Sequence, residues 1–307
     1  MAEVYAALAP VFILIALGWA ARNRRVATPE QFGVVNRFGY FILYPAFLFT
    51  IVTGANFSNR DAAPFVLAVL AGFAAMMILA LAMRLAFRDD GPAFTSVFQG
   101  ALRWNGFPLL AAAAALYGPL GEELIGIVFG PLVFAVNIAS VIVLSRWGAN
   151  RAANWRAVLD QIIANPLILA CAAGLLAQTA GVTHFGPVSE ALRLLGQAAM
   201  PVALLTVGAG LDFAALRADG VKVTAATILK LIVAPAMLWL MATVFGVSPG
   251  AVAIAVGIGA TPTAAAGYTL AREMGGDARL VAAIITATTL VSFVTMPLAI
   301  SLALSSP

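Results

Sequence analysis

The sequence predicts an all-α polytopic membrane protein whose ten transmembrane helices form two inverted five-helix repeats. Three observations predict this fold: an unusually apolar composition, ten apolar runs of spanning length, and a match between the two halves of the chain. Of the 307 residues, 63% are hydrophobic and 10% are charged, whereas soluble domains carry about 25% charged residues. The chain has too little polar surface to face water on all sides, so lipid must be part of its solvent.

A spanning helix needs about 20 mostly apolar residues, and ten such runs follow one another along the chain. They are residues 4–21, 32–53, 64–86, 93–117, 123–146, 158–178, 187–208, 221–245, 250–272 and 279–304. Gly, Pro and polar residues interrupt the fourth and ninth runs, at 103–108 and 257–263. We therefore expect these two helices to be broken inside the membrane.

Basic residues gather in every second loop between these runs. Twelve of the 17 basic residues lie there: Arg22, Arg24, Arg25, Arg84, Arg88, Arg146, Arg151, Arg156, Arg217, Lys222, Arg272 and Arg279. The opposite loops hold Arg60, with Arg193 near a helix end. Because cytoplasmic loops carry the excess of Lys and Arg, we expect both termini on the non-cytoplasmic side of a bacterial inner membrane. Glu3 precedes the first run and the arginines follow it, which is the reverse of a secretory signal.

The second half of the chain repeats the first at a shift of 156 residues. The pairs that coincide are Pro10 with Pro166, Gly18 with Gly174, Pro45 with Pro201, Thr50 with Thr206, Gly54 with Gly210 and Phe57 with Phe213. We divide the chain into a first repeat at 1–148, a cytoplasmic linker at 149–156 and a second repeat at 157–307. Because five is an odd number, the repeats enter the membrane from opposite sides. Inverted repeats with broken helices predict a transporter with its site near the bilayer midplane.

The break in the fourth run contains an arginine deep in the membrane. Arg103 lies about ten residues from either end of the run, which is roughly 15 Å deep. A charge at that depth marks a functional site by default, so we interpret Arg103 as a docking charge for an anionic substrate. Asn105 would hydrogen-bond the substrate, while Gly106 and Pro108 break the helix. The alternative is a structural arginine that bonds carbonyls exposed by the break.

The break in the ninth run is centred on Pro262, between Thr261 and Thr263. The half-helix that follows the proline presents free N–H groups and the positive end of its dipole, which suits a carboxylate. The alternative is a kinked packing helix, since Gly and Ala also permit close helix contact.

Three further polar residues lie inside expected spans. Asn137 in the fifth run fits two roles equally, facing the site or bonding a neighbouring helix. Lys230 lies about seven residues into the eighth run, and we expect its side chain to snorkel to the cytoplasmic interface; the same interpretation applies to Arg37. The kinks at Pro45 and Pro201 are interpreted as architectural.

Several function classes are disfavoured. The acidic residues all fall in loops or near span ends, so no carboxylate is expected at mid-membrane to relay protons or hold Na⁺. One histidine, His184, and one cysteine, Cys171, cannot form a His/Cys metal cage, and we expect no metal and no cofactor. The basic residues sit between apolar runs, which argues against nucleic-acid binding. We expect that the protein is not an enzyme. Residues 208–212 match an intramembrane aspartyl protease motif only in part.

One segment resembles a known family. Ala260-Thr-Pro-Thr-Ala-Ala-Ala-Gly-Tyr-Thr-Leu-Ala-Arg-Glu-Met-Gly-Gly-Asp277, with the Thr-rich run through Pro297, is similar to the auxin efflux carrier family, which includes bacterial malonate-type permeases and plant auxin exporters. Asn165-Pro166, Gly174 and residues 201–210 add to the resemblance. It implies a fold like that of bile-acid symporters and Na⁺/H⁺ antiporters, with a scaffold and a crossover transport domain. Asn105 to Pro108 and Thr261 to Thr263 would be the crossover points, although the stretch before Pro108 is more compact than in bacterial members.

We therefore predict a secondary transporter that moves a small organic anion across a lipid bilayer by alternating access. Malonate-like dicarboxylates and auxin-like monocarboxylates both fit the prediction, and a homodimer is compatible with it. The alternatives are a solute channel, a membrane-embedded sensor, and a Na⁺-coupled symporter of the bile-acid type.

Overall fold

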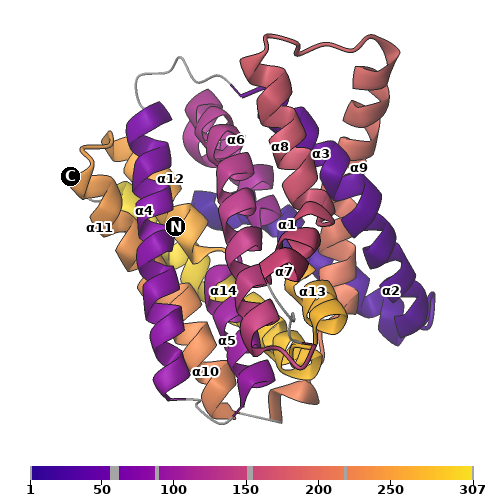
Figure 1. The fold of residues 1–307 in the computed structure, drawn as a ribbon. Coiled ribbons are helices and arrows are strands. Elements are labelled where there is room, and N and C mark those ends of the chain that lie inside the picture. Colours follow the sequence, from indigo (N-terminus) through magenta and orange to yellow (C-terminus); the bar gives the residue numbers. More distant parts are fainter. Residues whose placement is uncertain (1, 56–61, 87–89, 151–154, 218–219, 306–307) are drawn as a thin grey trace.

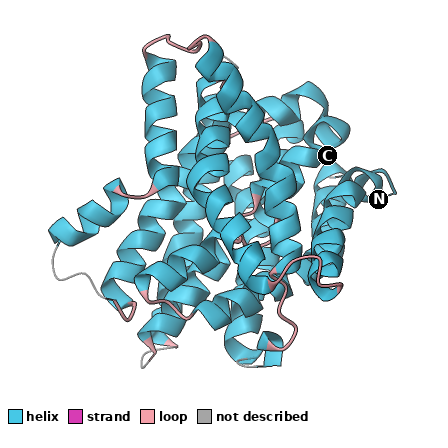
Figure 2. Cartoon of the chain, turned by 90° about the vertical axis from the view of Figure 1, so that its right-hand side faces the viewer, coloured by secondary structure: helices cyan, strands magenta, loops and turns pink. Residues whose placement is uncertain are grey.

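A computed structural model describes residues 2–55, 62–86, 90–150, 155–217 and 220–305. Within these ranges the regular secondary structure is entirely helical, and short loops join the helices (Figure 2). Four residues used in the sequence analysis lie outside the described ranges: Phe57, Arg60, Arg88 and Arg151.

Seven helical segments of the described chain are long and apolar enough to cross a membrane. They are α1 (Ala2–Asn23), α2–η1–α3 (Pro29–Thr53), α4–η2 (Ala62–Leu85), the second part of α6 (Glu123–Trp147), α9 (Pro187–Ala209), α10–η4–α11 (Gly220–Val244) and α14 (Ala278–Ser305). The pair α7 (Trp155–Ile163) and α8 (Pro166–Thr179) bends by 69° and would count as an eighth span. The chain is therefore a multi-span membrane protein.

The expected fourth and ninth runs each consist of two helices separated by a break. The fourth run comprises α5 (Gly91–Leu102) and the start of α6 (Gly106–Trp147), which changes direction at Gly118, where φ is 63°. The ninth run comprises α12 (Pro249–Ala260) and α13 (Ala266–Met274). A helix of 12 residues is about 18 Å long, which is shorter than the bilayer core.

Proline chemistry explains where the second break falls. A residue that precedes proline is driven out of the α region, and Thr261, which precedes Pro262, has an extended backbone with ψ at 149°. In the first break Asn105 caps α6 through its side-chain oxygen, which accepts the N–H of Phe107 at 3.3 Å. Pro108 lies in the first turn of α6, where a missing N–H costs nothing.

The helices pack into two groups. The first body comprises α1, α2, α3, α8 and α9, in which α1 packs on α9, and α3 packs on both α8 and α9. The second body comprises α4, α5, α10, α11, α12, α13 and α14, whereas α6 contacts helices of both groups. In Figure 1, α4, α10 and α11 lie on the left and α2, α3, α8 and α9 on the right, with α6 between them.

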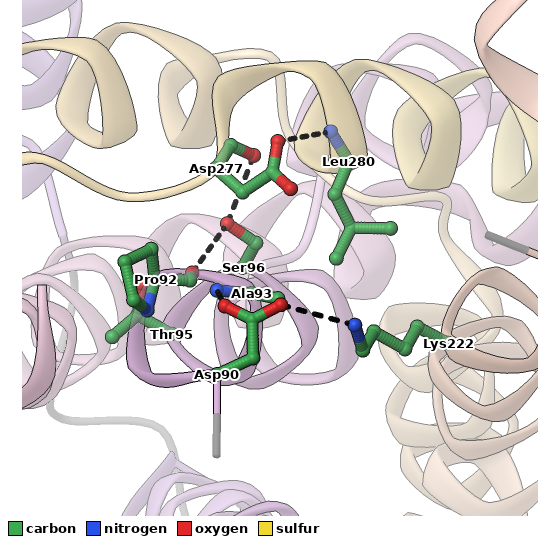
Figure 3. A network of polar contacts seen from close by, with 8 residues as sticks. All are labelled: Asp90, Pro92, Ala93, Thr95, Ser96, Lys222, Asp277 and Leu280. Carbon is green, nitrogen blue, oxygen red and sulfur yellow. Dashed lines mark hydrogen bonds and ion pairs between the residues drawn. The ribbon is translucent and has the colours of Figure 1, made fainter. Parts of the chain in front are cut away.

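A polar network ties the helices of the second body together at one end (Figure 3). Asp90 accepts the N–H of Ala93 at 3.0 Å and so caps α5, and its second oxygen pairs with Lys222 of α10 at 3.1 Å. Ser96 of α5 donates to the backbone oxygen of Asp277, just before α14, at 2.9 Å. These contacts hold the first half-helix in a fixed position relative to its neighbours.

Candidate functional site

The two helix breaks meet in the interior of the protein. The N–H of Asn105 donates to the carbonyl oxygen of Pro262 at 2.9 Å. The hydroxyl of Thr263 donates to the carbonyl oxygen of Gly100, near the end of α5, at 2.6 Å. Thr261 and Thr263 are fully buried, and Asn105 is nearly so. Each break therefore satisfies backbone groups of the other, which is how irregular backbone is tolerated at membrane depth.

The threonines of the second break are fully engaged with the backbone. The hydroxyl of Thr261 donates to Ile258 oxygen at 2.8 Å, and the N–H of Thr263 donates to the hydroxyl of Thr288 on α14 at 3.2 Å. Neither threonine, nor Pro262 or Pro108, lies in the lining of the cavity described next. In this structure these four predicted site residues lie in or beside the region where the two breaks contact each other, which we call the crossing.

We expect Thr263→Val to destabilise the crossing, because it leaves the buried carbonyl of Gly100 without its donor. An unsatisfied buried acceptor costs about 1–3 kcal/mol, which should lower the unfolding temperature of the purified protein by several degrees. Thr263→Ser should retain the wild-type temperature. Thr243→Val is the matched control, since the Thr243 hydroxyl also donates to a carbonyl oxygen, at Trp239, but on an exposed helix face. Equal unfolding temperatures for Thr263→Val and Thr243→Val would contradict the bracing role.

A cavity that opens on one side lies between the two bodies. Helices α3, α8 and α9 of the first body line one side, and the two breaks and α6 line the other. Most of the lining is apolar, with an aromatic cluster of Tyr44, Phe47, Trp104, Phe107 and Phe129. Four predicted site residues line the cavity: Arg103, Asn105, Gly106 and Asn137.

Arg103 is the charged group of this lining, and it is only 3% exposed. Its Nε donates to Gln99 Oε1 and its Nη2 to Asn137 Oδ1, both at 3.0 Å. These bonds use two of the five guanidinium N–H groups and end on side-chain amide oxygens, not on the backbone carbonyls of the break. Within the described chain Arg103 forms no ion pair. A buried cation without a counter-ion is costly, so the cavity favours an anion.

The N-terminus of α13 adds to this positive field. Residues 264–266, at and just before the start of α13, line the same cavity as Arg103. The two groups are close, because a Cβ on Gly267 would lie 3.0 Å from Arg103 Cδ. The Ncap residue, Ala265, makes no side-chain cap bond. The N–H groups of Gly267 and Tyr268 donate to the carbonyl oxygens of Ala264 and Ala265, at 3.1 and 3.0 Å. The positive end of the helix dipole and the adjacent guanidinium would both stabilise a carboxylate.

Part of the cavity lining, including Trp104 and Tyr44, was not predicted from the sequence. Trp104 is 5% exposed, and its indole Nε1 has no hydrogen-bond partner among the described residues; its position beside Arg103 was the available signal. Tyr44, which directly precedes the Pro45 kink that was interpreted as architectural, lines the cavity. Asn137 lines the cavity and also accepts a hydrogen bond from Arg103 at the first break.

The prediction that Lys230 snorkels to the interface is wrong. The side chain is fully buried, and its Nζ donates to the carbonyl oxygen of Gly259 at 2.9 Å. The face of the helix that carries Lys230 points toward α12, so a protein carbonyl is within reach and water is not. Arg37, in contrast, is exposed, and its guanidinium lies 5.8 Å from the ring centroid of Phe41. His184 is exposed.

Comparison with known proteins gives two matches. A family model described as "Membrane transport protein" matches residues 3–161 and 152–300. A protein of Rhizobium meliloti (strain 1021), described as "Putative malonate transporter", is 24% identical over 302 residues, which cover 96% of this chain and 94% of that protein. Both matches extend over nearly the whole chain, including the two breaks and the cavity lining.

Proposed function

The chain belongs to the auxin efflux carrier family of membrane transport proteins, and on this premise we propose that it moves a small carboxylate across the bilayer by alternating access. The observation that carries the proposal is Arg103, a buried guanidinium that faces a cavity. Among the described residues its partners are neutral, and three of its five N–H groups are unused. Guanidinium binds carboxylates in a bidentate manner, and burial strengthens such a bond.

The lining supports a substrate that is an anion with a small or flat body. One carboxylate would bind the free side of the Arg103 guanidinium, beside the start of α13, and the aromatic cluster would offer apolar contact to the remainder of the molecule. A malonate-like dicarboxylate would place its second carboxylate near Asn105 and the unpartnered Nε1 of Trp104. An auxin-like monocarboxylate would stack its ring on the aromatic cluster. The name of the Rhizobium meliloti relative favours including malonate in any test.

Ten spans and an inverted repeat form part of the proposal. We count residues 91–117 as the fourth span, the bent α7–α8 pair as the sixth, and residues 249–274 as the ninth. Two equivalent contacts support the repeat: Gly18 of α1 packs against the backbone of Leu205 on α9, and Gly174 of α8 packs against the backbone of Phe49 on α3. In the inverted repeat the first span corresponds to the sixth, and the second span corresponds to the seventh. The contact of Gly18 with Leu205 joins the first and seventh spans. Its counterpart, the contact of Gly174 with Phe49, joins the sixth and second spans. The repeats would comprise 1–148 and 157–307, with 149–156 as the cytoplasmic linker.

The two bodies provide a basis for alternating access. The first body would be the scaffold, and the second, which contains both breaks, would be the transport domain that moves against it. The cavity lies between these bodies, so their relative movement would open it to alternate sides. Ten spans would place both termini on the same side, and the distribution of the basic loops supports the non-cytoplasmic face.

Uptake into proteoliposomes tests the proposal directly. We expect labelled malonate or indole acetate to enter vesicles that contain the protein, and unlabelled acid to compete with the labelled acid. The corresponding uncharged amide should not compete, because it lacks the charge that Arg103 and the α13 N-terminus bind. Protein-free vesicles and vesicles with Arg103→Ala are the controls. Equal competition by the acid and its amide would contradict the anion-carrier proposal, even if the protein moved another solute.

A further inference from the structure

Lys230 places an amine in the interior of the second body. It lies on η4 (Leu229–Val233), the short π-helical segment between α10 and α11, and its side chain has no exposed surface. Its Nζ donates to Gly259 oxygen at 2.9 Å and lies 5.8 Å from the ring centroid of Phe73 on α4. Ion pairs in the described part of the chain do not include Lys230. A carbonyl and an aromatic ring, not a carboxylate, therefore surround the amine.

The carbonyl that Lys230 binds belongs to the end of a broken helix. Gly259 lies in the last turn of α12, which ends at Ala260, one residue before the crossing of the breaks begins. The last four carbonyls of a helix lack helical partners and carry the negative end of its dipole. The absence of a side chain at Gly259 allows this contact, since a Cβ there would lie 2.8 Å from the Cα of Pro235 on α11. The helix that carries Lys230 thus packs directly on the end of α12.

In transporters built on broken helices, the C-terminal ends of half-helices coordinate the coupling Na⁺. Here an amine from the chain itself binds that end. We propose that Lys230 acts as a built-in cation for the C-terminal end of α12, so that carboxylate transport by this chain does not require Na⁺. The Na⁺ independence of transport rests on the proposed function. The structural part of the inference, that the end of α12 needs a cation and that Lys230 supplies it, does not depend on which substrate is transported.

Thermal unfolding of the purified, substrate-free protein tests this structural part. Wild type, Lys230→Gln and Lys230→Arg are compared in NaCl and in choline chloride at equal ionic strength. Wild type and Lys230→Arg should unfold at the same temperature in both salts. Loss of a hydrogen bond to a charged group should lower the unfolding temperature of Lys230→Gln in choline chloride by about 5 °C. Na⁺ should restore at least half of that loss, because it can bind the carbonyls that the ammonium has left.

The matched control is Lys222→Gln, which removes the other lysine of the chain from the same helical unit but at its partly exposed end. Its unfolding temperature should not respond specifically to Na⁺. A Lys230→Gln protein that is destabilised but insensitive to Na⁺ would show a purely structural lysine and overturn the inference, as would Na⁺-specific stabilisation of wild type. If Lys230→Gln yields no folded protein, wild type and Lys230→Arg carry the test, and Na⁺-specific stabilisation of either would overturn the inference.

Transport then tests the consequence. Where wild-type vesicles accumulate a carboxylate, the rate should be the same in Na⁺ and in choline. A Na⁺ requirement in wild type would overturn the inference and leave the carboxylate proposal intact. Conversely, failure of every carboxylate to be transported would overturn the proposed function, while the unfolding measurements would still decide the role of Lys230.

Discussion

Arg103→Ala is expected to weaken carboxylate binding by at least about 100-fold, which corresponds to about 2.7 kcal/mol. The physical reason is that the substrate loses a charge-assisted, two-pronged hydrogen bond in a buried site, where such bonds contribute about 1.5–3 kcal/mol. Arg103→Lys should retain part of the affinity, because the charge remains. A lysine cannot replace the planar fork that bonds Gln99 and Asn137 while it presents further N–H groups to the cavity. Calorimetric titration of the purified variants with malonate and indole acetate measures the effect.

Two controls separate lost binding from lost structure. Arg193→Ala removes an arginine whose side chain is 47% exposed and pairs with Glu190 on the same helix; it should bind like wild type. The unfolding temperature of substrate-free Arg103→Ala shows whether the crossing survives. Carboxylate affinity equal to that of wild type in a folded Arg103→Ala protein would make Arg103 structural and would end the anion hypothesis.

Sequence alone predicted where the helices break, because the cause is local. Pro262 forces Thr261 into an extended conformation, and Asn105 is a good N-cap residue. Arg103 donates to Gln99, four residues earlier, and helical spacing alone predicts that these two side chains are neighbours. Its other partner, Asn137, is 34 residues away and depends on how α6 returns past the break. That contact is a property of the tertiary structure and no spacing rule supplies it.

The same limit explains the outcome for the threonines and Lys230. A hydroxyl beside a proline is equally suited to a substrate or to a backbone carbonyl, and only the position of Gly100 shows that Thr263 donates to a carbonyl. Lys230 lies close enough to the expected interface for its side chain to reach water, so distance along the helix favoured snorkelling. The direction in which its helix face points was decided by packing on Gly259, a contact between residues 29 positions apart.

The contact between α1 and α9 depends on two glycines, one from each helix. A Cβ on Gly208 of α9 would overlap the carbonyl oxygen of Ile15 on α1, and a Cβ on Gly18 of α1 would overlap that of Leu205 on α9. Backbone therefore touches backbone in both directions, as in membrane helix pairs built on small residues. A flexible side chain could move aside to accommodate a methyl group, but the carbonyl of a helix can move only with the helix.

Gly208→Ala is accordingly expected to force α1 and α9 apart and to destabilise the first body. Overpacking costs typically 1–3 kcal/mol and more where no side chain can yield, so we expect the unfolding temperature to fall by about 10 °C. The matched control is Gly33→Ala, since Gly33 lies in exposed helix α2 and a Cβ there meets nothing within 4 Å. Alanine at that position should leave stability unchanged or raise it slightly, because glycine is the poorer helix former. Scanning fluorimetry of the purified variants compares the two substitutions. If Gly208→Ala unfolds no earlier than Gly33→Ala, α1 and α9 are not packed as closely as the structure places them, and the support that this contact gives to the inverted repeat is lost.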